Sequence, residues 1–228
     1  MNAGFGETSP IVLAPSTFEE AYTMMMQALN RSDRYQHPVI VLVDKQLCEG
    51  YKTVKKSDLT QGKIDRGERA TLPSSDAQDT YLRYQITESG ISPYAIPGEG
   101  LTRMTTSYEH DEAGATSESP ETKQAQMQKR FKKRTTFLAQ EYQNDQIAYE
   151  VVNPYAENFF VTRGINRYNL EALIKDRPDR GVIVIKVFHP FCPSLIDFFK
   201  NHQHQIKKLI FVEMNYEGQM EKIVRQEC

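Results

Sequence analysis

The fold is decided by residues 181–219, which read GVIVIKVFHPFCPSLIDFFKNHQHQIKKLIFVEMNYEGQ. Two short apolar runs in this stretch, residues 182–187 and 209–213, have the length and the β-branched content of buried strands. Residues 194–201 lie between them and have the length of a short helix. A strand, a helix and a second strand in this order predict parallel strands in one sheet, joined by a helical crossover.

The same pattern extends to both sides of this stretch. Residues 159–162 predict a strand, and residues 169–177 predict a helix that ends at Pro178. Residues 218–226 predict a last helix after the strand at 209–213. Three strand–helix units predict that residues 146–228 form an open, mostly parallel α/β sheet. Ligands and partners of such sheets meet the loops at the carboxyl ends of the strands, here 163–166, 189–193 and 215–219.

Residues 1–44 predict one further strand–helix–strand unit. The apolar runs 11–14 and 39–43 predict the strands, and Ser16 or Thr17 is expected to cap the helix between them. The helix repeats apolar residues at spacings of three and four, which places them on one buried face. These residues are Ala21, Met24, Met25, Ala28 and Leu29. One such unit leaves unpaired strand edges, so we expect it to complete its sheet with another polypeptide.

Residues 45–145 are rich in turn-forming residues and have little periodicity. Residues 81–86 predict a lone strand, and a helix is expected near 120–142, with Ser119 as its N-cap. The apolar face of this helix is predicted to be Met127, Phe131, Leu138 and Tyr142. The basic run at 129–134 is then expected to face solvent, Phe131 excepted. We interpret this stretch as a loop-rich connector at a subunit interface.

The composition excludes several classes of protein. The chain has 228 residues and a 39% hydrophobic share. Its formal net charge of −2 gives no electrostatic attraction to nucleic acid, so no nucleic-acid partner is expected. No apolar run approaches the roughly 20 residues of a membrane span, so no membrane partner is expected either. The three cysteines, Cys48, Cys192 and Cys228, have neither metal nor cluster spacing. We therefore expect a reduced, cytoplasmic protein without a metal site of its own.

The densest polar group is Glu109-His110-Asp111-Glu112. A carboxylate beside a histidine makes a proton relay, and carboxylates are hard metal ligands, so both kinds of site are open here. The alternative, which we favour, is a loop anchored by charged hydrogen bonds to the protein or to another subunit. His189 and Cys192 leave a second choice open, between a thiol–base pair and a buried structural thiol, and we favour the latter.

Several stretches resemble the alpha subunit of the 2-oxoacid:ferredoxin oxidoreductases, and they resemble its 2-oxoglutarate branch more than its pyruvate branch. The resemblance lies in the strand and helix around residues 11–31, in residues 35–44 and in the loop motifs further along the chain. These motifs are GISP at 90–93, AIPG at 95–98, EHDEAG at 109–114, FHPFCP at 188–193 and VEMNYEGQ at 212–219. The order of the motifs is that of the family.

The resemblance implies a fold and a division of the chain. Residues 1–44 are expected to be the last strand–helix–strand of an incomplete pyrimidine-side thiamine-type domain. Residues 45–145 are expected to be the connector, and residues 146–228 a transketolase C-terminal-like open α/β domain, truncated at its end.

The resemblance also implies an activity that needs companion chains. Members decarboxylate a 2-oxoacid oxidatively with thiamine diphosphate, form an acyl-CoA and pass electrons through iron–sulfur clusters to ferredoxin. We expect a beta subunit to carry the thiamine diphosphate and a cluster. We expect another chain to supply the missing N-terminal pyrimidine region. This chain alone is expected to bind no cofactor and to have no activity.

The family's catalytic residues carry over to no position of this sequence. We expect the chain to begin after the family's Tyr-Pro-Ile-Thr-Pro region and the glutamate that activates thiamine. The candidate residues beside the site or at the interface are Glu109, His110, Asp111 and Asn215. The alternative is a noncatalytic interaction module, or a gene fragment, derived from such a subunit.

Overall fold

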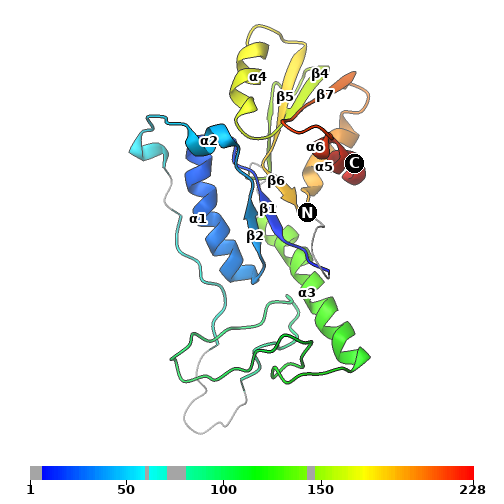
Figure 1. Ribbon diagram of the computed structural model, residues 1–228. Helices are drawn as coiled ribbons and strands as arrows, with labels where there is room; N and C mark the ends of the chain where they lie inside the picture. Colours follow the sequence, from blue (N-terminus) through cyan, green and yellow to red (C-terminus); the bar gives the residue numbers. More distant parts are fainter. Residues whose placement is uncertain (1–6, 60–61, 71–80, 143–146) are drawn as a thin grey trace. The chain divides into compact units, whose positions relative to one another are not determined.

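Figure 1 shows the computed structural model, which describes residues 7–59, 62–70, 81–142 and 147–228. The chain divides into two compact units. Unit 1 contains Met1–Leu29, Pro38–Lys63 and Glu141–Cys228, and unit 2 contains Asn30–His37 and Ile64–Gln140. The α/β class expected from the sequence is confirmed. None of the described helices is long and apolar enough to cross a membrane.

The first sheet of unit 1 has three strands in the order β2-β1-β6 (Figure 1). They are β1 (Ile11–Leu13), β2 (Val39–Val41) and β6 (Val187–His189). β1 and β2 are parallel and are joined by α1 (Phe18–Tyr35), which confirms the predicted strand–helix–strand unit. β6 lies antiparallel to β1, so one of the two edges expected to lack a partner is covered by this chain itself. The other edge belongs to β2.

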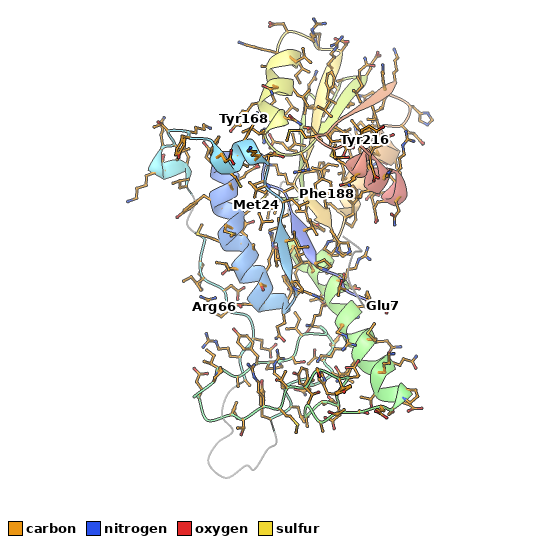
Figure 2. The ribbon with its side chains drawn as sticks, viewed as in Figure 1. Glu7, Met24, Arg66, Tyr168, Phe188 and Tyr216 are labelled. Atoms are coloured by element: carbon orange, nitrogen blue, oxygen red, sulfur yellow. The ribbon has the colours of Figure 1, made fainter. Side chains whose placement is uncertain are left out.

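Helix α1 begins at a hydroxyl cap. The Thr17 hydroxyl accepts a hydrogen bond from the Glu20 backbone N–H (3.0 Å), and the Glu20 carboxylate accepts one from Ser16 N–H (2.8 Å). This reciprocal arrangement satisfies amides that the first turn leaves without helical partners. Met24, labelled in Figure 2, and Ala28 are buried as predicted.

The predicted buried face of α1 is wrong at two positions. Met25 and Leu29 are 55% and 60% exposed. Each lies one residue beyond a buried residue, Met24 or Ala28, and one residue rotates the side chain by about 100° around the helix. The apolar residues of α1 therefore form two lines, of which only one is buried.

The second sheet of unit 1 has the order β3-β5-β4-β7. Its strands are β3 (Tyr149–Val152), β4 (Asn158–Thr162), β5 (Arg180–Ile185) and β7 (Lys208–Val212). β4 lies between β5 and β7 and is parallel to both, as predicted. β3, which the sequence reasoning missed, is antiparallel to β5. Its signal is only four residues long, but Tyr149, Val151 and Val152 are of the types that favour strands.

Helices cover both faces of this sheet. They are α4 (Asn166–Ile174), α5 (Pro193–Asn201) and α6 (Gln219–Glu227). Leu170 and Ile174 of α4 pack with Val182 and Val184 of β5 on one face. On the other face, Phe198 of α5 packs edge-on against Phe159. All residues from Val182 to Ile185 are fully buried, which explains why β5 has a continuous apolar run instead of alternation.

The remaining elements of unit 1 are two short ones that the sequence reasoning did not identify. They are α2 (Lys45–Glu49) and the 3₁₀ turn η1 (Lys56–Asp58).

The described part of unit 2 consists of a long helix, the end of α1 from Asn30 onward, and irregular chain. The long helix is α3 (Pro120–Glu141), close to the predicted 120–142. The strand predicted at 81–86 is wrong, since the described part of unit 2 has only isolated bridges, Arg69 with Tyr94 and His110 with Thr116. The backbone around Tyr84 bonds to side chains of α3 instead of to a neighbouring strand.

Candidate functional site

The loop at 109–117 in unit 2 contains three of the four candidate residues. Glu109 forms a bidentate ion pair with Arg130 of α3, with Nη1–Oε1 at 3.1 Å and Nη2–Oε2 at 2.6 Å. The hydrogen bond from Arg130 lowers the pKa of Glu109 below its usual value and outweighs the opposing effect of burial. This geometry fixes the loop to the helix.

His110 packs flat against Tyr84, with the two ring centroids 3.6 Å apart. Its Nδ1 atom lies 4.0 Å from the nearest Glu109 oxygen, which is too far for a hydrogen bond. In the described part of the chain this buried nitrogen has no hydrogen-bond partner. Glu109 and His110 therefore do not form a proton relay, which was one of the two alternatives to an anchored loop.

Asp111 uses its carboxylate within its own turn. Its Oδ1 accepts the backbone N–H groups of Ala113 (3.0 Å), Gly114 (2.9 Å) and Ala115 (2.9 Å). Gly114 allows this turn because its φ of 98° lies in the left-handed region. Glu112 in turn accepts the backbone N–H of Ile86 (2.7 Å).

The four polar side chains of this loop thus favour the anchored-loop interpretation. Among the residues that the structure describes, no three His, Cys, Asp or Glu side chains gather as a metal site would require.

The buried face of α3 differs from the predicted one. It consists of Gln126, Lys129, Lys133 and Phe137, whereas Phe131 is 39% exposed. The prediction assumed that every lysine of the basic run faces solvent. Here two ammonium groups are buried because each donates to a backbone carbonyl, Lys129 to Tyr84 (2.8 Å) and Lys133 to Gln36 (3.1 Å).

Burial changes the acid–base behaviour of these two lysines. It lowers the pKa of Lys129 to about 7, with a further contribution from the charge of Lys133. It lowers the pKa of Lys133 to about 8. The only sequence signal for them is the spacing of 126, 129, 133 and 137, which places these residues on one side of a helix.

In unit 1, the Asp44 carboxylate binds the backbone of the loop after β4. The buried Asp44 accepts the backbone N–H of Ile165 at 2.7 Å and lies 3.4 Å from a guanidinium nitrogen of Arg163. Gly164 has a φ of 65°, and a Cβ there would lie 1.7 Å from Asp44 Oδ2. The start of α4, where an anion would otherwise bind, is therefore occupied by Asp44.

Asn215, the fourth candidate, lies in the loop after β7 in unit 1. Its Oδ1 accepts the Gln219 N–H (3.0 Å), and its amide donates to Glu213. Glu213 also accepts the N–H groups of Met220 (2.7 Å) and Glu221 (3.2 Å) at the start of α6. This second helix start is thus also capped from within. Tyr216 at the loop tip is fully exposed (Figure 2).

In the loop at 189–193, His189 and Cys192 do not form a thiol–base pair. His189 Nδ1 lies 2.6 Å from the Pro10 carbonyl oxygen, so the ring contacts the chain before β1. The buried Cys192 Sγ has the Ser194 hydroxyl at 3.1 Å. Both contacts favour a structural thiol over a nucleophile, because a reactive thiolate needs access and a nearby base.

Comparison with known proteins gives consistent matches. The family model described as "Pyruvate flavodoxin/ferredoxin oxidoreductase, thiamine diP-bdg" matches residues 2–129. The 2-oxoacid:ferredoxin oxidoreductase subunit alpha of Saccharolobus solfataricus is 31% identical over 99% of this chain and 35% of its own length. The 2-oxoglutarate synthase subunit KorA of Methanocaldococcus jannaschii is 25% identical over 98% of this chain and 57% of its own length.

A solved structure matches as well. The 2-oxoglutarate:ferredoxin oxidoreductase from Magnetococcus marinus, with 2-oxoglutarate, coenzyme A and succinyl-CoA bound, has a TM-score of 0.79 and 30% identity. The match covers 100% of this chain and 39% of the other. The chain thus spans little more than a third of the Saccharolobus subunit and of this solved chain. These matches confirm the resemblance inferred from the sequence motifs, and the chain belongs to the pyruvate flavodoxin/ferredoxin oxidoreductase family of thiamine-diphosphate-binding proteins.

Proposed function

We propose that this chain is part of the alpha subunit of a thiamine-diphosphate-dependent 2-oxoacid:ferredoxin oxidoreductase. With companion chains it converts a 2-oxoacid of the 2-oxoglutarate type into an acyl-CoA and passes electrons to ferredoxin. The observation that carries the proposal is the similarity to such alpha subunits over 99% of the chain. The substrate class is supported by the 2-oxoglutarate bound in the Magnetococcus marinus enzyme. We place the complex in the cytoplasm.

The two loops that lead from β4 into α4 and from β7 into α6 do not fit the diphosphate end of thiamine diphosphate. A diphosphate needs free backbone N–H groups at a helix start, a metal ion held by protein oxygens, or both. Asp44 and Glu213 already occupy the starts of α4 and α6, and no metal-ligating cluster exists in the parts of the chain that are described. We therefore assign the diphosphate and the iron–sulfur clusters to companion chains, the beta subunit first among them.

The role left to this chain is to build the surroundings of the site. Two internally braced loops suit such a role, because a braced loop loses little conformational entropy when a partner binds it. One is the loop at 109–117, braced by Glu109, His110 and Asp111. The other is the loop at 213–219, braced by Asn215, with exposed Met214 and Tyr216 at its tip. Exposed aromatic residues of this kind are typical anchors of protein interfaces.

Reconstitution tests the proposal. The tagged chain is co-expressed with the polypeptides encoded beside its gene, and the purified complex is assayed for 2-oxoacid-dependent reduction of a viologen dye with coenzyme A. We expect reduction with the complex, faster with 2-oxoglutarate than with pyruvate, and none with the chain alone. A stable complex that oxidises no 2-oxoacid, or a chain that is active alone, would overturn the proposal.

The misfit of the diphosphate also supports a second candidate, a noncatalytic interaction module. The same assay separates the two. Omission of this chain abolishes dye reduction if it builds the site, and leaves the rate of the remaining subunits unchanged if it is such a module.

A further inference from the structure

Strand β2 exposes a row of unpaired backbone groups. Ile11 N–H donates to the Pro38 carbonyl (2.9 Å), and Leu42 N–H donates to the Leu13 carbonyl (2.7 Å). Backbone groups alternate sides along a strand, so residues 38, 40 and 42 face β1 and residues 39, 41 and 43 face away from it. The outward N–H and C=O groups of these three valines have no hydrogen bond within the described part of the chain.

The side chains of this edge do nothing to block pairing. Residues 39–43 contain neither a charge nor a proline, and Ile40 and Leu42 are 41% and 37% exposed. Sheet edges that stay unpaired usually have lysine, proline or a bulge. The edge strand β7 of the second sheet begins with an exposed lysine, Lys208. The β2 edge therefore has the composition of a strand with neighbours on both sides.

Helix α1, which joins β1 to β2, exposes a matching apolar line. Tyr22, Met25 and Leu29 are three and four residues apart and are all exposed. Residues at these spacings lie on one face of a helix, where a second helix packs. An added strand with its own helix, the usual unit of a parallel sheet, would bring such a helix beside α1.

We propose that the β2 edge accepts a parallel strand from the companion chain that carries the rest of the thiamine-type domain. This inference rests on the proposed function, which it deepens by naming the docking edge. The matched relatives are long enough to contain such a strand outside the part that this chain matches, since this chain spans 35% of the Saccharolobus subunit and 39% of the solved chain. The mode is strand addition, in which main-chain hydrogen bonds of Val39, Val41 and Val43 supply the binding.

Residue-resolved hydrogen exchange on the full chain tests the assignment, with the products of the adjacent genes as the probe. In the chain alone, the amides of Ile40 and Leu42 are expected to be protected, because they bond to β1. The amides of Val39, Val41 and Val43 exchange quickly. In the complex, those three amides slow by at least about tenfold, as expected for a newly formed hydrogen bond.

Two substitutions extend the test to binding. Val41→Pro removes only an outward N–H and is expected to weaken co-purification with the companion chain at least about tenfold, while the chain still folds. Ile40→Lys places a charge on the same edge without changing the backbone and should have the same effect. Ile64→Lys, at an exposed site in unit 2, is the matched control and should bind normally.

The outcomes separate the docking edge from the proposed function. An active complex in which Val39, Val41 and Val43 still exchange quickly would overturn the docking edge and leave the function intact. Protection of these amides in the chain alone, together with a dimer in sedimentation, would assign the edge to a second copy and also overturn the inference. Protection in a complex without 2-oxoacid oxidation would support the docking edge and refute the function.

Discussion

The two units satisfy their backbone in different ways. In unit 1, strands pair with strands, and the interior is then filled with apolar side chains such as Phe159, Val161 and Ile183. In unit 2, carbonyl groups of irregular chain accept side-chain donors instead. Lysine, glutamine, threonine and tyrosine side chains bond to the carbonyls of Tyr84, Gln36, Ser92, Ser89 and Pro93. A segment without a sheet thus needs polar groups inside, because buried carbonyls must be paired.

Since polar groups occupy much of the interior of unit 2, we expect its buried apolar side chains to be especially important for its stability. Phe137 is 1% exposed, meets Tyr35 edge-on with ring centroids 5.2 Å apart, and has the Arg31 guanidinium 5.9 Å from its centroid. We expect Phe137→Ala to lower the free energy of unfolding by about 3–5 kcal/mol, the usual cost of deleting a buried phenylalanine. Urea denaturation followed by circular dichroism measures the change.

Phe131→Ala is the matched control on the same helix. Its ring is partly exposed, so the expected loss is below about 1 kcal/mol. Equal losses at the two positions would support the helix face predicted from the sequence and contradict the burial of Phe137 and the exposure of Phe131.

In unit 1, a charged cluster lies among the apolar side chains, in contrast to the hydrogen-bonded carbonyls of unit 2. Lys186 is buried and bonds to Glu20 (2.6 Å) and Glu150 (2.9 Å), and Arg167 bonds to Glu150 and Glu171 (2.6 Å each). Burial favours a higher pKa for Glu20, but attraction and hydrogen bonding by Lys186 outweigh it and lower the pKa.

We expect Lys186→Met to cost about 2–3 kcal/mol at pH 7, less than for a fully buried pair because Glu150 is partly exposed. The lowered carboxylate pKa means that the stabilisation by Lys186 is present above the usual glutamate range and is lost as the pH falls below it. The difference in unfolding free energy between the unchanged chain and Lys186→Met should therefore become smaller at low pH. The exposed pair of Lys222 and Glu217 provides the control, since Lys222→Met should change stability by less than about 0.5 kcal/mol. A Lys186→Met gap that stays constant with pH would contradict the ionic role.

Most of unit 1 could be predicted from the sequence, because strands with full burial produce apolar runs that need no context. The predicted strand–helix units hold with shifts of a few residues. The single strand predicted at 182–187 is wrong, because it ends at Ile185 in β5 and the chain resumes at Val187 as β6 of the other sheet. The missed strand β3 is short and depends on pairing with β5, a contact that no local pattern contains.

Unit 2 could not be predicted in the same way. Lys129 is buried because a carbonyl far along the chain, that of Tyr84, needs a donor. Charge patterning places lysine on the solvent side by default. For the candidate site, the sequence located the loop at 109–112 but not the partners that brace it, such as Arg130 and Tyr84. Those partners come from distant segments and are fixed only by tertiary structure.

The buried lysines make unit 2 sensitive to pH. The pKa of Lys129 is lowered to about 7 in the folded protein, whereas an unfolded lysine titrates near 10.5. Between these values the unfolded chain holds the extra proton, so stability rises with pH across this window, by up to about 1.4 kcal/mol per pH unit. Lys129→Met should flatten this rise in denaturation series from pH 7 to 10. The exposed neighbour Lys132 is the control, and an unchanged slope in Lys129→Met would contradict the assignment.

The smallest expected effect concerns the turn in the candidate loop. Asp111 accepts three backbone N–H groups through Oδ1 alone, so Asp111→Asn keeps the acceptor and should leave both stability and 2-oxoacid oxidation by the reconstituted complex nearly unchanged. Asp111→Ala removes the acceptor and should cost about 1 kcal/mol, because the freed amides are partly open to water. If Asp111→Asn instead lost activity about tenfold with no loss of stability, the charge itself would act in the site. The loop would then be more than a braced surface, and the contrast between a sheet-built unit and a side-chain-built unit would have a catalytic consequence.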